Sequence, residues 1–368
     1  MVDNISNPDI VIIGSDLHPP IANFEGSIAQ TIFNGISLKK IHRISICVAR
    51  EGESDKNFTC LRSPIKRPLL LKKIYLGVAL IAKIRLALKQ GVPVFHFVRA
   101  GQDFLGAFLC LWLRLAGRKV VVTLLSDAPS MLGLRFSHAI LVHSPKALNY
   151  LISNGADVRK CVCINPPVRF STPSKRMALK INLSNNTRFQ FLVLSAPNSR
   201  AQIGRRGVPL LIDACQILDA RGAPIDVCIH GRWPEGHGIL QSMIERANVR
   251  NLQIKTAVLD NLGAEIEKSA GIILPYTGKG MPDVPLSALE AAALGRCVLA
   301  TQGLGIGQLL RGYPGYFEIP VNPRALADAL EQAAICHWDE LGDWAQREMT
   351  RFSPENFTRD IQAIYERI

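Results

Sequence analysis

The sequence predicts an α/β protein of two tandem doubly wound domains, and three observations support this prediction. Short apolar runs of strand length alternate with helix-like segments almost throughout the chain, as in βαβ units around a parallel sheet that is buried on both faces. The length of 368 residues corresponds to two or three domains. A polar segment, residues 171–187, separates two such alternating series and is predicted to be a linker.

The first series, residues 1–170, is predicted to form a Rossmann-like domain. Its strand-sized apolar runs are 10–13, 43–48, 92–98, 119–125, 139–142 and 161–164. The helix-like segments between these runs are 27–38, 69–88, 104–116 and 145–154.

The second series, residues 188–350, is predicted to form another Rossmann-like domain. Its strands are expected at 189–194, 225–230, 252–256, 270–274 and 298–300. Its helices are expected at 208–220, 238–247, 261–268, 285–294 and 324–333. Ligands of such sheets bind at the carboxyl ends of the strands. Two domains facing each other are therefore expected to form one ligand-binding cleft.

Positive charge is concentrated in the first half of the sequence. The net charge is +13. Residues 1–185 carry 25 Lys and Arg against 10 Asp and Glu, or +15, and residues 186–368 carry 18 against 20, or −2. A basic half can attract a nucleic acid, an anionic membrane or an acidic acceptor. No basic motif with interleaved aromatic residues supports nucleic-acid binding, so none is expected.

The cysteines and the first residues of the sequence favour a cytoplasmic protein. The nine cysteines are scattered, and Cys161 and Cys163 lack the spacing of a zinc or redox site. Reduced thiols are therefore expected. Residues 1–9 are polar and precede a strand-sized apolar run, unlike a signal peptide.

The most lipid-like stretch is 69–88, which Lys72, Lys73, Lys83 and Arg85 interrupt. A membrane-spanning helix needs about 20 mostly apolar residues, so this stretch is not expected to span a bilayer. Two interpretations remain open. The segment either lies on the inner face of an anionic membrane with its basic side chains toward the headgroups, or it is a core helix with a solvated basic edge.

The segment 274–295 has the composition of a phosphate-binding turn: a strand, a loop rich in Gly and Pro, and a helix. Pro285 suits the first turn of that helix, and Asp283 is expected to cap it. The free backbone N–H groups of Leu286 and Ser287, together with the helix dipole, then form a site for phosphate oxygens.

Glu290 lies in the second turn of the same expected helix. A carboxylate at this place can accept hydrogen bonds from both ribose hydroxyls of a nucleotide. The alternative is a solvated or salt-bridged helix residue. No carboxylate cluster has the spacing of a metal site, so no metal is expected.

The order of these features resembles that of the donor-binding domain in GT-B fold glycosyltransferases, specifically in the large retaining family 4. In that family a short segment supplies cations to the donor diphosphate. Here Arg206-Gly207 looks like its Lys-Gly pair, and Arg200 and Arg205 are further candidates. Guanidinium groups form charge-assisted bonds to a diphosphate and stabilise it as a leaving group. The alternative is a basic surface run.

The acidic signature of this family is Glu, seven residues, Glu. Glu290, with the Ala-Ala-Ala-Leu-Gly after it, resembles the second Glu. Pro282 occupies the first position, and Asp283 is out of register. In the family that first Glu contacts the donor sugar, and this sequence has no carboxylate at the matching position. Gly231 resembles the strand-ending glycine turn of the family.

In the first domain the resemblance is looser. Gly26 stands at the end of the loop after the first strand, where the family has a Gly-Gly turn near the donor phosphates. After residues 120–123 the family often presents a His near the reacting carbon. This sequence has none there, and Ser126 or Asp127 is expected to face the cleft instead. Residues 351–368 resemble the last helix of the fold, which returns to the first domain.

The resemblance implies a retaining, hexosyltransferase-type enzyme that moves a sugar from a UDP- or GDP-sugar to an acceptor hydroxyl, with no obligatory metal or other cofactor. Such enzymes act in glycan, polysaccharide or glycolipid synthesis. Asp127, Arg206 and Glu290 are the expected catalytic residues. The basic first domain is expected to hold a saccharide or a lipid-linked acceptor. Two further hypotheses are a degenerate accessory subunit that binds the nucleotide-sugar and a sugar-nucleotide epimerase.

Overall fold

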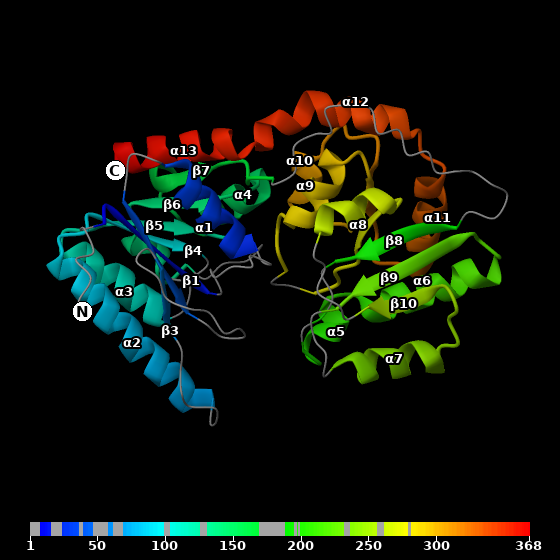
Figure 1. Cartoon of the computed structure of the whole chain (residues 1–368), viewed down its shortest axis with the longest axis horizontal. Coiled ribbons are helices and arrows are strands. Elements are labelled where there is room, and N and C mark those ends of the chain that lie inside the picture. Colours follow the sequence, from blue (N-terminus) through cyan, green and yellow to red (C-terminus); the bar gives the residue numbers. More distant parts are fainter. Residues whose placement is uncertain are drawn as a thin grey trace. The chain divides into compact units, whose positions relative to one another are not determined.

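The computed structural model consists of two compact units (Figure 1). The first unit comprises Met1–Pro167 and Pro354–Ile368, and the second comprises Val168–Ser353. The structure describes residues 8–15, 24–36, 40–46, 58–61, 69–98, 104–125, 131–168, 188–194, 197, 199–231, 236–255, 261–278 and 281–368.

The first unit is built on a seven-stranded parallel sheet with the order β3-β2-β1-β4-β5-β6-β7. Its strands are β1 (Ile10–Ser15), β2 (Ile41–Ile46), β3 (Phe58–Leu61), β4 (Val94–Val98), β5 (Lys119–Thr123), β6 (Ala139–Val142) and β7 (Cys161–Cys163). The strand order reverses between β1 and β4, as it does in doubly wound sheets.

Helices cover both faces of this sheet. They are α1 (Phe24–Gly35), α2 (Leu69–Lys89), α3 (Phe104–Leu115), α4 (Pro145–Ser153) and α13 (Pro354–Arg367). Successive strand residues point to opposite faces. Val11 and Ile13 therefore pack in the core with α2, α3 and α4, whereas Ile10 and Ile12 pack with α1 and α13. The C-terminal helix thus completes the core of the first unit.

A buried imidazole joins α13 to the sheet. His96 in β4 shares hydrogen bonds of 2.6 Å with the Tyr365 hydroxyl through Nδ1 and with the Thr123 hydroxyl through Nε2. Burial, and then the nearby His143, lower the pKa of His96 from 6.5 to about 3. The ring is therefore neutral near pH 7. Its two hydrogen bonds link β4 and β5 to the C-terminal helix α13.

The second unit is built on a six-stranded parallel sheet with the order β10-β9-β8-β11-β12-β13. Its strands are β8 (Phe189–Val193), β9 (Ile225–His230), β10 (Leu252–Lys255), β11 (Gly271–Leu274), β12 (Cys297–Thr301) and β13 (Tyr316–Ile319). Here the order reverses between β8 and β11.

The helices of the second unit follow its strands in the chain. They are α5 (Gln202–Arg205), α6 (Val208–Ala220), α7 (His237–Arg246), α8 (Leu262–Lys268), α9 (Leu286–Ala293), α10 (Ile306–Leu309), α11 (Pro323–Ala334) and α12 (Trp338–Glu348). α9 packs against β11, β12 and α12, so its position is fixed by the sheet. The predicted α/β class with two Rossmann-like units is confirmed.

The cysteines depart from the prediction at one position. Cys60 in β3 is disulfide-bonded, although reduced thiols were expected throughout. The other cysteines that the structure describes are not in disulfide bonds: Cys110, Cys161, Cys163, Cys215, Cys228, Cys297 and Cys336. The scattered spacing of the cysteines in the sequence gave no sign of this bond.

Candidate functional site

The candidate site lies at the carboxyl edge of the second sheet, where the strand order reverses. β8 and β11 are neighbours, and the chain leads from β8 to one side of the sheet and from β11 to the other. Doubly wound sheets bind their ligands at such a reversal, between the segments that follow the two strands. Here those segments are residues 199–208 after β8 and 275–285 after β11, the latter described except at 279–280.

These two segments approach each other closely at Gly207. Gly207 precedes α6 with a φ of 70°, in the left-handed region that favours glycine. A Cβ atom at this position would lie 1.5 Å from the carbonyl oxygen of Pro275. A larger residue therefore cannot fit unless the backbone moves, and Gly207 holds the preceding arginines against the segment after β11.

Hydrogen bonds join the same two segments. Thr277 donates its backbone N–H to the carbonyl of Arg205 at 3.0 Å and its hydroxyl to the carbonyl of Gly204 at 2.6 Å. On the other side, the hydroxyl of Thr301 at the end of β12 donates to the carbonyl of Tyr276 at 2.6 Å. The start of the segment after β11 is thus fixed by both of its neighbours.

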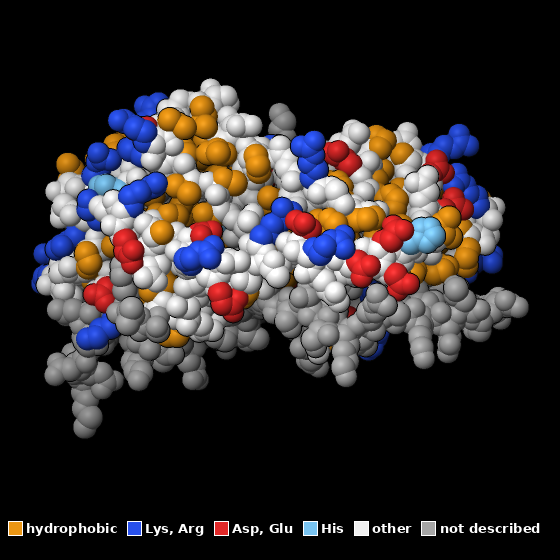
Figure 2. Space-filling model, turned by 90° about the horizontal axis from the view of Figure 1, so that it is seen from above, with side chains coloured by type: hydrophobic (Ala, Val, Ile, Leu, Met, Phe, Trp, Pro, Cys, Tyr) orange, Lys and Arg blue, Asp and Glu red, His pale blue; other side chains and the backbone are white. Residues whose placement is uncertain are grey.

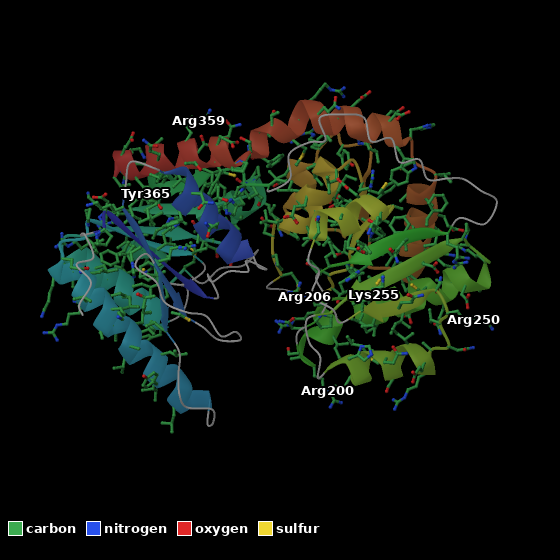
Figure 3. All side chains as sticks on the ribbon, in the orientation of Figure 1. Arg200, Arg206, Arg250, Lys255, Arg359 and Tyr365 are labelled. Atoms are coloured by element: carbon green, nitrogen blue, oxygen red, sulfur yellow. The ribbon has the colours of Figure 1, made fainter. Side chains whose placement is uncertain are left out.

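Arg206 is held in place more firmly than the other two predicted arginines. Its Nη1 donates to the Tyr276 hydroxyl at 3.2 Å, and its guanidinium carbon lies 5.3 Å from the centre of the Tyr276 ring, within cation–π range. Its Nε is buried and has no hydrogen-bond partner among the described residues. Arg200 and Arg205 are exposed. Figure 3 shows Arg200 and Arg206 beside α5.

The cap predicted for the helix after β11 is wrong. Pro285 is the N-cap residue of α9 rather than part of its first turn, and no side chain caps the helix there. The carboxylate of Asp283 is buried and accepts a hydrogen bond from the backbone N–H of Gly305 at 3.0 Å. Asp283 therefore anchors the turn after β12, which the fold brings next to it, and does not cap its own helix.

The first turn of α9 presents Leu286 and Ser287. Their backbone N–H groups have no acceptor within the helix and lie at its partly positive end. Leu286 is buried, whereas Ser287 is half-exposed. Solvent therefore reaches this turn on the side of Ser287.

Glu290 lies one turn further along α9 and is only 5% exposed. A solvated position, one of the two alternatives to a nucleotide contact, is therefore excluded. Burying a carboxylate is costly unless it is hydrogen-bonded or paired. Glu290 has a partner within the protein, so the second alternative, a paired helix residue, stands beside the nucleotide contact.

The end of β9 contributes a residue that the sequence prediction missed. Gly231 donates its backbone N–H to the carbonyl of Lys255 at 2.8 Å, so this group is not available to a phosphate. His230, the last residue of β9, is 6% exposed, and its Nδ1 has no hydrogen-bond partner among the described residues. Burial, and then Lys255, lower the pKa of His230. The lowered pKa favours the neutral ring, and its Nδ1 is a buried nitrogen at the carboxyl end of β9.

The candidates in the first unit are less well placed. α1 begins at Phe24, so Gly26 lies inside the helix and the predicted loop reaching Gly26 is wrong. The helix therefore begins three residues before the predicted start at residue 27. Apolar residues further along α1 pack on the sheet. Ser126 and Asp127 lie outside the described residues. Within the described ranges, no group of His, Cys, Asp and Glu side chains is arranged to hold a metal ion.

Comparison with known families connects this edge of the second unit to a class of enzymes. Residues 198–334 match the family model described as glycosyl transferases group 1. The matched range contains the predicted arginines, the start of α9 and Glu290. No curated protein matches the chain.

Solved structures with the same fold cover nearly the whole chain. Sucrose-phosphate synthase from Thermosynechococcus elongatus has a TM-score of 0.73 and 15% identity, with 98% of each chain covered. HepE from Anabaena, solved with UDP and glucose, has a TM-score of 0.71 and 13% identity, covering 98% of this chain and 100% of HepE. A glycosyltransferase from Rickettsia africae has a TM-score of 0.68 and 16% identity, with 98% of each chain covered.

The fold therefore defines the class: the chain has the two-domain GT-B fold of glycosyltransferases. Within this class it resembles glycosyl transferases group 1, and the family match lies in the second unit.

Proposed function

We propose that this protein is a retaining, hexosyltransferase-type glycosyltransferase that moves a sugar from a UDP- or GDP-sugar to an acceptor hydroxyl without an obligatory metal. One observation carries the proposal. The segment after β8 that bears Arg206 is fixed against the segment leading into α9, at the strand-order reversal of the unit that matches the glycosyl transferases group 1 model. HepE, which shares the fold, was solved with UDP and glucose.

The described residues suggest a division of roles around the donor. Arg206, with Arg205 and Arg200 near it, supplies positive charge to the diphosphate and stabilises the nucleotide as a leaving group. The Ser287 N–H at the positive end of α9 donates to a phosphate oxygen. Glu290 is proposed to accept hydrogen bonds from the ribose hydroxyls, and His230, at the end of β9, is proposed to contact the nucleoside.

The first unit is proposed to bind the acceptor, with Asp127 near the reacting carbon. Its charge favours an anionic partner, either an acidic saccharide or a lipid-linked acceptor at an anionic membrane surface. A glycan, polysaccharide or glycolipid assembled at the inner face of a membrane in the cytoplasm meets these requirements. Gly26, at the start of α1, is proposed to lie near the donor phosphates.

The test is incubation of the purified chain with a panel of UDP- and GDP-sugars. One donor is expected to raise the melting temperature, because a ligand that binds only the native state stabilises it. The same donor should be hydrolysed slowly to free sugar with its anomeric configuration retained. Absence of both binding and hydrolysis with every donor would contradict the proposal, and inverted product would remove retention from it.

A second candidate is a catalytically degenerate accessory subunit that binds the nucleotide-sugar. The specific observation in its favour is Pro282, which stands where the family has the Glu that contacts the donor sugar. Pro282 offers no carboxylate to a sugar hydroxyl. Donor binding without any turnover, even after cell-extract acceptors are added, would favour this candidate over the enzyme.

A further inference from the structure

Two helices of the first unit have apolar side chains on the face that points away from the core. A surface helix normally has one apolar stripe, which packs on the protein, and polar residues on the opposite side. α2 and α3 depart from this pattern over several turns. Large exposed apolar areas on a protein mark a surface that binds a membrane or another protein.

In α2, Leu76, Leu80 and Ile84 are buried in the core. At 100° per residue, the opposite direction is centred on residue 78. Val78 there is 63% exposed, and Ile74 beside it is 54% exposed. The outward face of α2 is therefore apolar over its first half.

In α3, Leu109, Cys110 and Leu113 are buried in the same core. The outward stripe carries Phe104, which is 81% exposed, and Leu115, which is 78% exposed. Phe108 lies between them on the same stripe and is also exposed. Exposing two phenylalanine side chains one turn apart to water is unfavourable. Covering them on binding therefore contributes favourably to the free energy of binding.

The two helices form one surface, which we call the α2–α3 face: Ile74, Val78, Phe104, Phe108 and Leu115. A Cβ at Gly77 of α2 would lie 3.3 Å from the Leu105 side chain of α3, and buried residues of both helices belong to one core cluster. Gly77 thus allows close packing that brings the two outward stripes together.

Basic residues border the α2–α3 face. Lys83, Arg85 and Lys89 are exposed in the second half of α2, and Arg114 is exposed in the last turn of α3. From residue 58 to residue 125 the sequence has 12 Lys and Arg and a single acidic residue, Asp103. Figure 2 views the molecule from the side of α12 and α13, and Lys and Arg side chains gather over the first unit on that side as well.

We infer that the α2–α3 face docks on an anionic phospholipid bilayer. Phenylalanine and aliphatic side chains enter the boundary between headgroups and acyl chains, while the lysines and arginines contact anionic headgroups, which is the arrangement of interfacial helices. No helix among the described residues meets the length and hydropathy needed to cross a bilayer. The inference deepens the membrane association proposed above, and in that respect rests on it.

The experiment is flotation of the purified full chain with vesicles of phosphatidylcholine containing phosphatidylglycerol, and with vesicles of phosphatidylcholine alone. The protein is expected to float with the anionic vesicles at low salt and to dissociate as salt screens the charges. The double variant Phe104→Ser/Phe108→Ser should need at least about tenfold more lipid for half-maximal binding. Lys83→Gln/Arg85→Gln/Lys89→Gln should also bind anionic vesicles more weakly and show a smaller dependence on salt.

A matched control removes exposed apolar area elsewhere. Ile335 and Val321 in the second unit are 79% and 57% exposed, and Ile335→Ser/Val321→Ser should float like the wild type. Circular dichroism and melting temperature verify that each variant is folded.

Two flotation results would overturn the inference: no flotation of the wild type with anionic vesicles, or equal flotation of the phenylalanine variant and the wild type. A third is a dimer in sedimentation equilibrium that the phenylalanine substitutions abolish, while the protein binds no vesicles. Donor binding, followed by melting temperature, separates this inference from the proposed function. If the protein floats with anionic vesicles but binds no sugar nucleotide, the docking surface is supported and the proposed sugar transfer is contradicted.

Discussion

The two units have the same architecture but differ in where their unusual features lie. In the second unit these features are at the carboxyl edge of the sheet, where Gly207, Thr277 and Thr301 fix neighbouring segments to one another. In the first unit they are on the outside of α2 and α3, where apolar side chains are exposed. The family model matches the second unit and does not extend into the first.

Under the proposed function, this difference lets one architecture serve two purposes. A doubly wound sheet fixes the ends of its strands, so short segments after the strands can bind a small ligand with little freedom. The helices that cover the sheet are free to vary on their outer faces. The charge of +15 on residues 1–185, against −2 on residues 186–368, fits an extended anionic partner for the first unit and a compact ligand for the second.

The largest effect is expected from Gly207→Ala, which tests the rigidity of the second unit. The matched control is Gly222→Ala, because Gly222 has a φ of 66° but no atom within 4 Å of its Cβ position. The left-handed conformation alone should lower the free energy of unfolding by about 1 kcal/mol in the control. The added clash with Pro275 should raise the loss to about 3 kcal/mol or more in Gly207→Ala. Equal losses in urea unfolding would mean that the two segments are not held together at this point.

The next effect concerns the first unit and depends on pH. The pKa of His96 is lowered from 6.5 to about 3 in the folded state, so the unfolded state binds the proton more readily. Stability from this group is complete above pH 6.5 and falls as the pH drops toward 3. Between pH 7 and pH 4 the loss should be about 3 kcal/mol.

His96→Gln is expected to reduce the dependence of urea unfolding on pH over this interval. The pKa of His143 is lowered to about 4 by burial and contributes in the same direction in both proteins. An unchanged pH dependence in the variant would show that His96 does not govern the acid stability of this unit.

A smaller effect is expected from Arg206→Ala, which tests the anion site of the second unit. Loss of charge-assisted bonds to a diphosphate should weaken binding of the sugar nucleotide roughly 30-fold, or about 2 kcal/mol. Arg246→Ala is a suitable control, because Arg246 is exposed on α7 of the same unit. Isothermal titration with the donor identified in the panel provides the measurement, and equal affinities for the two variants would remove Arg206 from the site.

The smallest effect is expected from Tyr276→Phe. This change keeps the ring over Arg206 and removes the hydroxyl that accepts a hydrogen bond from it, so donor affinity should fall roughly fivefold, or about 1 kcal/mol. The control is Tyr316→Phe, because the buried Tyr316 hydroxyl has no hydrogen-bond partner among the described residues. If donor affinity falls equally in both variants, Tyr276 does not position Arg206.

The general fold could be predicted because buried parallel strands are continuous apolar runs. The edge strands β3 and β13 were missed, since both are partly exposed and lack such a run. α5 was missed because it has only four residues. α12 was missed because only a few of its residues, such as Trp344, are buried, and its sequence is mostly polar.

The candidate site could be predicted where one segment contains the signal. Arg206 was predicted from the resemblance to family 4, and Glu290 from the strand, loop and helix around it together with that resemblance; their binding roles remain predictions. His230 and Tyr276 were missed because their significance depends on packing between distant segments: Arg206 and Tyr276 are 70 residues apart. Asp283 was assigned to the nearest helix, whereas the fold places its carboxylate on Gly305.

The central claim is that the second unit binds a sugar nucleotide beside α9. The substitution Glu290→Ala tests this claim most directly. Donor affinity of Glu290→Ala is to be compared by titration with that of the wild type and of Glu245→Ala, whose side chain is exposed on α7, after circular dichroism has verified that the variants are folded. The account predicts a loss of at least about tenfold for Glu290→Ala and none for Glu245→Ala. A folded Glu290→Ala protein that binds the donor as tightly as the wild type would contradict it.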